Sequence, residues 1–259
     1  MTASPAEPPG ATPSQPPAEP PGAKPSQPLG EPLNWRPAAR PAAREHRGTH
    51  VTLRPLAADR DAAALYAISH PPEGDPSIWT YLYDGPFANA EELRDAMAQR
   101  AAEPDTLFFV VAEVRSGRPL GMVAYLAIVP DHGSIELGHI WFSAALKRIA
   151  GATEAIYLLC RHAIDDLGYR RLEWKCNALN QPSRAAAQRF GFIYEGTFMQ
   201  HRVAKGRNRD TAWFALTDGR WPSVRAAFQT WLAAENFDAR GVQRTRLSAL
   251  TAALGGHAT

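Results

Sequence analysis

A short loop between an apolar strand pattern and an amphipathic helix pattern holds residues suited to binding an anion. The first N–H groups of a helix have no partner within the helix, and the helix dipole is positive at that end, so such a loop can hold phosphate groups. Small side chains leave the backbone accessible, and an arginine adds a positive charge. An ordinary strand-to-helix connection has a similar composition, so the loop alone defines no function. The loop follows Trp141 and Phe142 and contains Arg148, Ala150, Gly151, Ala152 and Thr153.

The apolar pattern around this loop predicts a domain built from strands and helices. Strand patterns alternate or run continuously apolar, whereas helix patterns repeat every three to four residues. Asn89 and Asn180 are suited to cap helices, and Gly168 and Gly191 are suited to end them. An α/β domain with a mixed sheet and helices on both faces follows. The predicted strands are 50–55, 106–114, 119–128, 134–142, 171–177, 192–203 and 207–216, and the predicted helices are 59–69, 89–102, 153–167, 180–190 and 221–234.

The two ends of the chain differ from this body in composition. Residues 1–47 are rich in proline and alanine, contain thirteen of the 23 prolines, and include two copies of a Pro-rich repeat. Such a segment cannot bury enough apolar surface to offset the entropy of ordering, so we expect a disordered tail at 1–47. Arginines near the other end lead us to expect a flexible basic tail at 237–259. Residues 48–236 are then the folded domain.

Charge, cysteine content and hydropathy disfavour several classes of protein. The formal net charge of +2 is too small to indicate a nucleic-acid-binding protein. Cys160 and Cys176 fall on apolar patterns, so we expect two free core cysteines rather than a disulfide. No apolar run approaches the length that spans a bilayer, and the first residues contain no apolar signal core. We therefore expect a cytoplasmic protein, a monomer or homodimer, without membrane association or a metal site.

Three segments, in this order and at these separations, resemble the GNAT family of N-acetyltransferases. The loop with the spacing Arg-x-x-Gly-x-Thr is similar to the one that holds the diphosphate of acetyl-CoA in that family. The segment from Asn180-Gln-Pro-Ser183 to Phe-Gly-Phe-Ile-Tyr-Glu-Gly is typical of the Rim-type branch, which includes ribosomal-protein N-terminal acetyltransferases. The third segment is Gly-Arg-Asn-Arg-Asp-x-x-Trp-Phe-x-Leu. The predicted element order over residues 50–217 is that of the GNAT acyl-CoA N-acyltransferase fold, a central mixed, mostly antiparallel sheet flanked by helices.

The resemblance implies that acetyl-CoA is the co-substrate and that the strand before the loop separates from strand 171–177 to admit the pantetheine arm. Backbone groups near Trp141 and Phe142 would then meet the arm and the thioester carbonyl. Asn180 would hydrogen-bond the pantetheine, although capping a helix is a sufficient role for it. Ser183 would protonate the leaving sulfur, and its alternative is a solvent-facing serine in the first helical turn.

The residue that takes the proton from the substrate is left open by the sequence. Glu136 fits the usual carboxylate role in the family, and His139 has an unperturbed pKa closer to neutral pH. Side chains alternate between the faces of a strand, so only one of these two is predicted to point into a cleft. A histidine among apolar neighbours is also often a core residue. His201, in a later strand, is a third candidate.

An aromatic loop between the first two predicted helices lies where the family builds its acceptor site. Trp79, Tyr81 and Tyr83 could form a stacking wall for the substrate. Alternatively, they anchor a loop that covers the core.

The resemblance therefore implies an N-acetyltransferase that moves an acetyl group from acetyl-CoA to a primary amine by direct attack in a ternary complex. The amine would belong to a protein N-terminus or to a small molecule. The alternative is a non-catalytic acyl-CoA-binding module that senses the cofactor. A nucleic-acid-binding protein is the least favoured reading.

Overall fold

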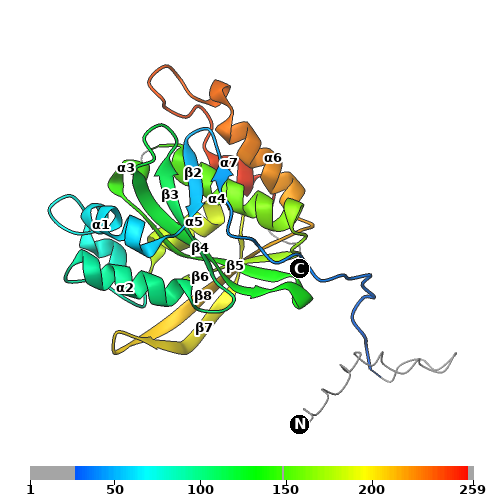
Figure 1. The fold of residues 1–259 in the computed structure, drawn as a ribbon. Coiled ribbons are helices and arrows are strands. Elements are labelled where there is room, and N and C mark those ends of the chain that lie inside the picture. Colours follow the sequence, from blue (N-terminus) through cyan, green and yellow to red (C-terminus); the bar gives the residue numbers. More distant parts are fainter. Residues whose placement is uncertain (1–26, 148, 256–259) are drawn as a thin grey trace, which may run out of the picture. The chain divides into compact units, whose positions relative to one another are not determined.

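A mixed sheet with mostly antiparallel pairing organises the part of the chain from Arg36 onward (Figure 1). The computed structural model describes residues 27–147 and 149–255, of which residues 27–35 belong to a separate unit and contain no helix or strand. Among the described residues the strand order is β1-β2-β3-β4-β5-β6-β8-β7, and only β5 and β6 pair in parallel. The strands are β1 (His46–Arg47), β2 (Val51–Pro55), β3 (Leu107–Glu113), β4 (Pro119–Val129), β5 (Ser134–Phe142), β6 (Arg171–Asn177), β7 (Ile193–Ala204) and β8 (Arg207–Thr217).

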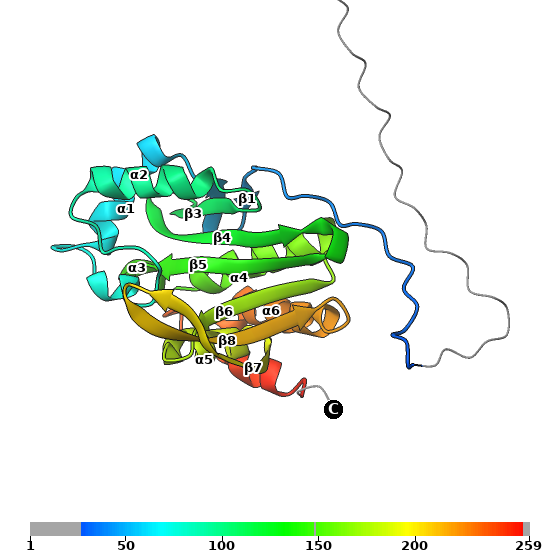
Figure 2. The same cartoon turned by 90° about the horizontal axis from the view of Figure 1, so that it is seen from below.

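Helices cover both faces of this sheet, as the sequence predicts. Helices α1 and α2 lie on one face, and α4 and α6 lie on the other (Figure 2). The α helices are α1 (Ala58–Ser69), α2 (Ala90–Ala101), α3 (Ala144–Lys147), α4 (Gly151–Arg161), α5 (Gln181–Arg189), α6 (Trp221–Leu232) and α7 (Leu247–Ala252). Shorter turns of helix are η1 (Pro76–Trp79), η2 (Pro130–His132), η3 (His162–Asp166) and η4 (Ala234–Asn236), of which η3 is a π-helix.

The continuous apolar run in β3 is explained by burial of this strand on both faces. Successive side chains of a strand point to opposite sides. Phe109 and Val111 pack in the cluster that contains α4 and α6, whereas Phe108 and Val110 pack in the cluster that contains α1 and α2. The sheet is therefore the middle layer of three.

Strands β5 and β6 separate partway along their length. They pair from Ser134 with Arg171 as far as Leu137 with Trp174, and no further. On the other side of β5 the register to β4 shifts, and His139, at a φ of 47°, lies within this bulge. A bulge bends the strand that carries the extra residue. The separation expected from the resemblance is present.

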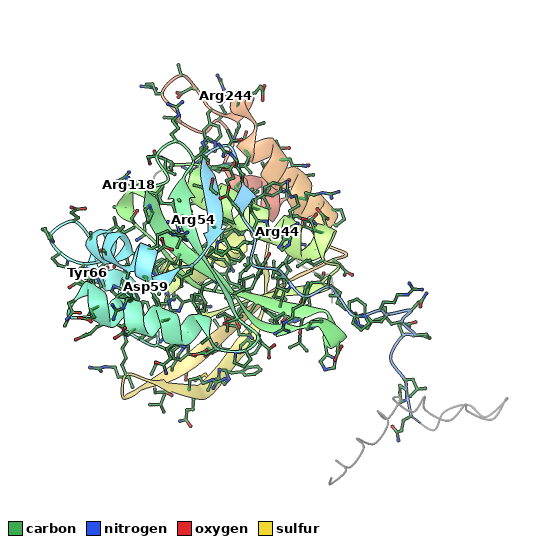
Figure 3. The ribbon with its side chains drawn as sticks, in the orientation of Figure 1. Arg44, Arg54, Asp59, Tyr66, Arg118 and Arg244 are labelled. Atoms are coloured by element: carbon green, nitrogen blue, oxygen red, sulfur yellow. The ribbon has the colours of Figure 1, made fainter. Side chains whose placement is uncertain are left out.

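The N-terminal boundary of the folded part lies earlier than the predicted residue 48. The backbone N–H groups of Ala38 and Ala39 donate to carbonyls of Pro130 and Leu167 at 3.1 and 2.9 Å. Strand β1 then pairs with β2. Arg44, labelled in Figure 3, forms an ion pair of 3.4 Å with Asp166. The predicted tail 1–47 is therefore wrong for residues 38–47, and its first 26 residues lie outside the described part.

The C-terminal boundary is also wrong, because residues 237–255 fold against the domain rather than forming a flexible tail. The side chain of Asn236 donates to the carbonyl of Thr245 and accepts from its N–H, at 3.1 and 2.8 Å. The indole N–H of Trp231 donates to Gln243 at 2.7 Å. Leu247, at the start of α7, is fully buried. Residues 256–259 lie outside the described part.

Candidate functional site

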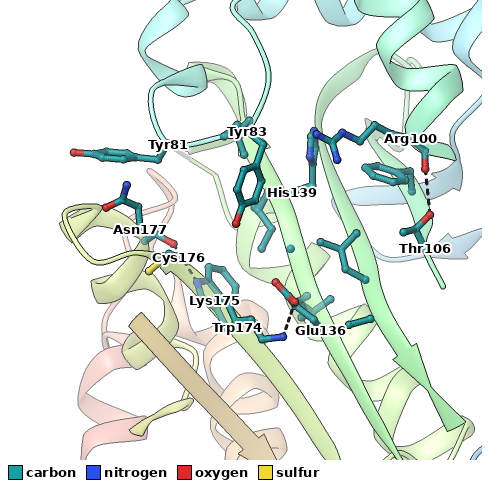
Figure 4. Close-up of a pocket in the computed structure, with 18 of the residues that line it drawn as sticks. Tyr81, Tyr83, Arg100, Thr106, Glu136, His139, Trp174, Lys175, Cys176 and Asn177 are labelled. Atoms are coloured by element: carbon teal, nitrogen blue, oxygen red, sulfur yellow. Dashed lines mark hydrogen bonds and ion pairs between the residues drawn. The ribbon is translucent and has the colours of Figure 1, made fainter. Parts of the chain in front are cut away.

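A cavity of about 400 Å³ lies where β5 and β6 separate (Figure 4). Its walls come from β5, β6, the first turn of α5, the end of α2, and the loop between α1 and α2. Figure 4 shows Tyr83 reaching from this loop into the cavity. Among the site residues predicted from sequence, those that line it are Glu136, His139, Asn180, Ser183, Tyr81 and Tyr83. We call it the cleft.

Glu136 belongs to a charged row that crosses β5 and β6. Its carboxylate accepts a hydrogen bond from the Lys175 ammonium at 2.9 Å, and Lys175 also pairs with Glu173 at 2.7 Å. The Lys175 ammonium lies 4.3 Å from the ring centroid of Trp213. Burial raises the pKa of Glu136 above its usual value, and Lys175 opposes that rise. Although burial disfavours the charge of Lys175, the two carboxylates raise its pKa. The result is a fixed carboxylate with increased proton affinity.

His139 lines the same cleft, so the prediction that only one of His139 and Glu136 can point into it is wrong. The β5 bulge is the cause, because strict alternation holds only in a regular strand. Burial lowers the pKa of His139 to about 4; Asp84 opposes this shift and Arg100 adds to it. The ring lies edge-on to Phe108, with centroids 5.2 Å apart. At neutral pH this imidazole is uncharged.

Ser183 and Asn180 are held together at the start of α5. The Ser183 N–H donates to Asn180 Oδ1 at 3.1 Å, so Asn180 is the helix cap that the sequence predicts. The indole N–H of Trp174 donates to Ser183 Oγ at 3.0 Å. The hydroxyl oxygen accepts this bond, and the Ser183 hydroxyl also interacts with the Cys176 thiol, whose pKa it lowers against the effect of burial.

The aromatic residues of the loop between α1 and α2 lie in two different environments, the cleft and the core. Tyr81 and Tyr83 line the cleft, and the Tyr81 hydroxyl donates to the carbonyl of Leu179 at 3.3 Å. Trp79 is 1 % exposed and packs on Trp141 with ring centroids 5.5 Å apart. The predicted substrate-wall role of Trp79 therefore needs correction: it is a core residue that anchors the loop.

Trp141 and Phe142 close β5 with side chains directed away from the cleft. Trp141 is 3 % exposed in the cluster beneath α1 and α2, and Phe142 packs partly buried on the opposite core cluster. Neither side chain lines the cleft. Any contact of Trp141 and Phe142 with a cofactor would therefore be made by their backbone groups, as expected from the sequence.

The proposed anion loop borders a second cavity, of about 1110 Å³, which we call the α4 cavity. Lys147, Ala150, Ala152 and Thr153 line it. Its other walls are α5, the end of α6 and the segment that follows. Helix α4 begins two residues before its predicted start, and Arg148 lies outside the described residues.

Gly151 has a packing role in this loop. A Cβ built on it would lie 2.7 Å from Val51 Cγ1, so glycine allows α4 to approach β2 closely. Gly151 itself is buried, and it does not line the α4 cavity. Its predicted part in phosphate binding, through the backbone N–H at the start of α4, stays a prediction, whereas Ala150 and Ala152 line the cavity.

Six cations that were not predicted as site residues line these cavities, and besides Arg100, Lys147 and Arg240 they include three that bear on the site. Lys175 and Arg209 line the cleft, and Arg189 lines the α4 cavity. Arg189 Nη2 donates to Thr153 Oγ1 at 2.9 Å. For Lys175 a signal was present: charged residues at 171, 173 and 175 alternate with apolar ones, which marks a polar face of a strand. Arg189 and Arg209 carry no comparable local signal.

His201, the third proton-transfer candidate, lies on β7 and does not line the cleft. Its ring lies 6.0 Å from that of Trp213, and burial lowers its pKa. Cys160 and Cys176 are both buried and free, as predicted.

The described residues contain neither a candidate metal centre nor a membrane-spanning helix. Within residues 27–147 and 149–255 there is no cluster of three or more side chains suited to holding a metal ion. None of the helices described combines the length and apolar character needed to cross a bilayer.

Comparison with known proteins points in one direction. The family described as "Acetyltransferase (GNAT) domain" matches residues 50–193. The crystal structure of a GCN5-related N-acetyltransferase from Brucella melitensis is 41 % identical, covers 85 % of this chain and 99 % of its own, and has a TM-score of 0.80. A probable acetyltransferase (GNAT family) from Chromobacterium violaceum is 44 % identical, covers 78 % of this chain and 99 % of its own, and has a TM-score of 0.70.

A more distant likeness concerns the Rim-type branch. A putative ribosomal-protein-serine acetyltransferase from Vibrio cholerae is 21 % identical, covers 67 % of this chain and 97 % of its own, and has a TM-score of 0.55. At this identity the likeness shows a shared fold.

Proposed function

We propose that this chain, which belongs to the GNAT family of acetyltransferases, transfers an acetyl group from acetyl-CoA to a primary amine by direct attack in a ternary complex. The observation that carries the proposal is the cleft. It gathers a fixed carboxylate, Glu136, and a hydroxyl, Ser183, around the gap between β5 and β6. Amide formation from a thioester needs a proton acceptor and a proton donor on either side of one carbonyl.

Two features support a fit to acetyl-CoA. Beyond Leu137, β5 has no partner on its β6 side among the described residues, so its backbone groups are available to the amides of a pantetheine arm. The α4 cavity offers Lys147 and Arg189 beside the first turn of α4, a setting suited to pyrophosphate. Arg148 remains a proposed phosphate ligand, outside the described residues. Acetyl-CoA supplies the activated thioester.

The residues of this chain would divide the proton transfers between them. Glu136 accepts, through water, the proton that the amine loses as its nitrogen bonds to the carbonyl carbon. Backbone N–H groups near Trp141 and Phe142 face the oxygen on which negative charge develops. Ser183 donates its proton to the sulfur as the carbon–sulfur bond breaks. His139 lines the same cleft and is the second candidate acceptor, but its pKa, lowered by burial to about 4, makes it a weaker base than an ordinary imidazole.

The test is a thiol-release assay with acetyl-CoA and a panel of amines, beside a thermal-shift measurement with acetyl-CoA alone. We expect acetyl-CoA to raise the melting temperature and at least one amine to accelerate CoA release. A raised melting temperature without amine-dependent release would contradict the proposal and favour an acyl-CoA-binding module instead. An unchanged melting temperature together with no CoA release would contradict both the acetyltransferase and the acyl-CoA-binding module.

A further inference from the structure

Arg209 is the one cation on the cleft wall that lacks a carboxylate partner among the described residues. The other two are paired: Lys175 with Glu136 and Glu173, and Arg100 with Asp84 at 3.1 Å. Arg209 is 7 % exposed, and its side chain has no carboxylate within ion-pair distance in the described part of the chain. A buried cation without an anion is unfavourable unless other groups solvate it.

Two groups hold the Arg209 guanidinium in place without using all of its donors. Nη1 donates to the carbonyl of Tyr81 at 2.7 Å, and the guanidinium carbon lies 4.4 Å from the ring centroid of Tyr83. Nε is buried and finds no hydrogen-bond partner in residues 27–147 and 149–255. The side chain is therefore held by two groups, incompletely hydrogen-bonded, and part of the cleft wall.

Strand β8, which carries Arg209, has two more residues with buried polar atoms that lack hydrogen-bond partners among the described residues. Thr211 and Trp213 follow at alternate positions of β8 and so share its face. Thr211 Oγ1 and Trp213 Nε1 are buried without hydrogen-bond partners among the described residues. Buried polar groups in native proteins are nearly always paired. Of these three residues Arg209 alone lines the cleft, where a ligand could supply an acceptor for its guanidinium.

We propose that Arg209 binds a carbonyl or carboxylate oxygen of the acyl acceptor close to its amine, so that the preferred acceptors are α-amino carbonyl compounds. This inference rests on the proposed function and names its substrate class. Arg209 and Glu136 line one cavity of about 400 Å³, so a small acceptor can place its amine toward Glu136 and its oxygen toward Arg209. The oxygen supplies the acceptor that the guanidinium lacks.

The position of Arg209 favours a role toward the acceptor rather than toward acetyl-CoA. Both of these contacts are with the aromatic loop, through the carbonyl of Tyr81 and the ring of Tyr83. The groups assigned to acetyl-CoA lie on β5 beyond Leu137, at the start of α5 and at the start of α4, and Arg209 contacts none of these through a hydrogen bond among the described residues. A second cation, Lys205, donates to the carbonyl of Trp79 in the same loop at 2.7 Å, but it does not line the cleft.

The experiment compares three acceptors of matched shape: L-alaninamide, L-alanine and isopropylamine, which lacks the oxygen. The measured quantity is the ratio of kcat/KM for each carbonyl compound to that for isopropylamine, in the wild type and in Arg209→Gln. The three amines differ in basicity, but this difference is the same for both proteins. It therefore cancels when the wild-type ratio is divided by the ratio for Arg209→Gln. We expect the ratio to fall at least about tenfold in Arg209→Gln. The alaninamide and alanine arms distinguish a carbonyl from a carboxylate.

Two further variants separate this role from loop support. Arg209→Lys keeps the charge but loses the planar fork, and we expect it to recover part of the ratio. Lys205→Met removes the other tether of the same loop, and we expect its ratio to match the wild type. Equal falls in Arg209→Gln and Lys205→Met would overturn the proposal, because the loop alone would then explain them.

The remaining outcomes are equally decisive. An unchanged ratio in Arg209→Gln, with acetylation intact, overturns the inference and leaves the proposed function standing. Weaker acetyl-CoA binding with an unchanged ratio assigns Arg209 to the cofactor and also overturns it. If no amine of any kind is acetylated by the wild type, the proposed function fails and the inference fails with it.

Discussion

The cleft and the α4 cavity differ in how their charges are balanced. The cleft has equal numbers of acidic and basic side chains on its wall: Glu103, Asp105, Glu136, Arg100, Lys175 and Arg209. The α4 cavity is lined by Lys147, Arg189 and Arg240 against one carboxylate, Asp238. A cavity whose acidic and basic side chains are equal in number suits proton transfer at a site without net charge. A cavity with an excess of cations suits a bound anion. The difference fits the proposal that the cleft performs the chemistry and the α4 cavity holds the pyrophosphate of acetyl-CoA.

The largest expected effect is that of Glu136→Gln. Removing the proposed proton acceptor should lower kcat/KM for the amine about 100-fold, while acetyl-CoA binding stays unchanged. In the wild type the rate should rise with pH as Glu136 ionises, with a midpoint above the usual glutamate pKa because burial raises it. Thiol release as a function of pH measures both effects, and the variant should lack this rise.

Glu173→Gln is the matched control for that experiment. Glu173 pairs with the same Lys175 at 2.7 Å but does not line the cleft. We expect less than about a threefold change, since the proposed acid–base group remains. Equal effects of the two variants would show that the ion-pair row matters and the identity of Glu136 does not.

Ser183→Ala should have the next largest effect. Loss of the proton donor should lower kcat about tenfold with little change in either KM. Trp174→Phe, which removes the indole N–H that donates to Ser183 Oγ and keeps an aromatic ring, should lower kcat less. A Ser183→Ala enzyme as fast as the wild type would remove Ser183 from the mechanism.

Arg189→Gln tests the other side of the comparison. We expect the Kd for acetyl-CoA to rise about tenfold, because a charge-assisted contact to phosphate is lost, while the KM for the amine stays unchanged. Gln188→Ala, an exposed neighbour on α5, is the control. Isothermal titration measures the Kd. A change in amine KM without a change in Kd would reverse the assignment of the two cavities.

The smallest effect on activity should come from histidines outside both cavities. The rings of His46 and His162 lie 4.3 Å apart in the core, and burial lowers their pKa values to about 4 and about 3. In the unfolded chain these two histidines bind protons near pH 6.5, whereas in the folded chain they stay unprotonated until the pH is much lower. Stability is therefore full above that pH and declines as the pH falls toward 4.

Replacing His46 with phenylalanine should flatten this decline and leave both KM values at neutral pH unchanged. Each histidine accounts for a slope on the order of 1 kcal/mol per pH unit in the unfolding free energy. Urea titrations at several pH values measure it. An unchanged slope would show that His46 titrates normally in the folded chain.

The sequence predicted those parts of the site that depend on local pattern. Strand and helix order, the Asn180 cap and the position of Ser183 follow from residues that are near one another in the chain. Glu136 was predicted as a candidate from its strand position and from the carboxylate role that the family resemblance implies. Each of these depends on contacts of short range or on a regular element.

The errors share a different cause, which is dependence on distant contacts or irregular backbone. The direction of His139 depends on a bulge that periodicity does not reveal. Trp79 is a core residue because Trp141, far along the chain, packs on it. The fold of the last residues depends on buried Leu247 and on the bonds between Asn236 and Thr245, none of which a basic composition predicts.

The most direct test of the central claim is mass spectrometry of a reaction of the protein with acetyl-CoA and the amine panel, in which both the amines and the protein are weighed. Direct attack in the cleft predicts an amine that gains one acetyl group, at a rate that Glu136→Gln strongly reduces, and a protein whose mass does not change. Acetyl-CoA that binds without yielding an acetylated amine, or an acetyl group that accumulates on the protein, would contradict it.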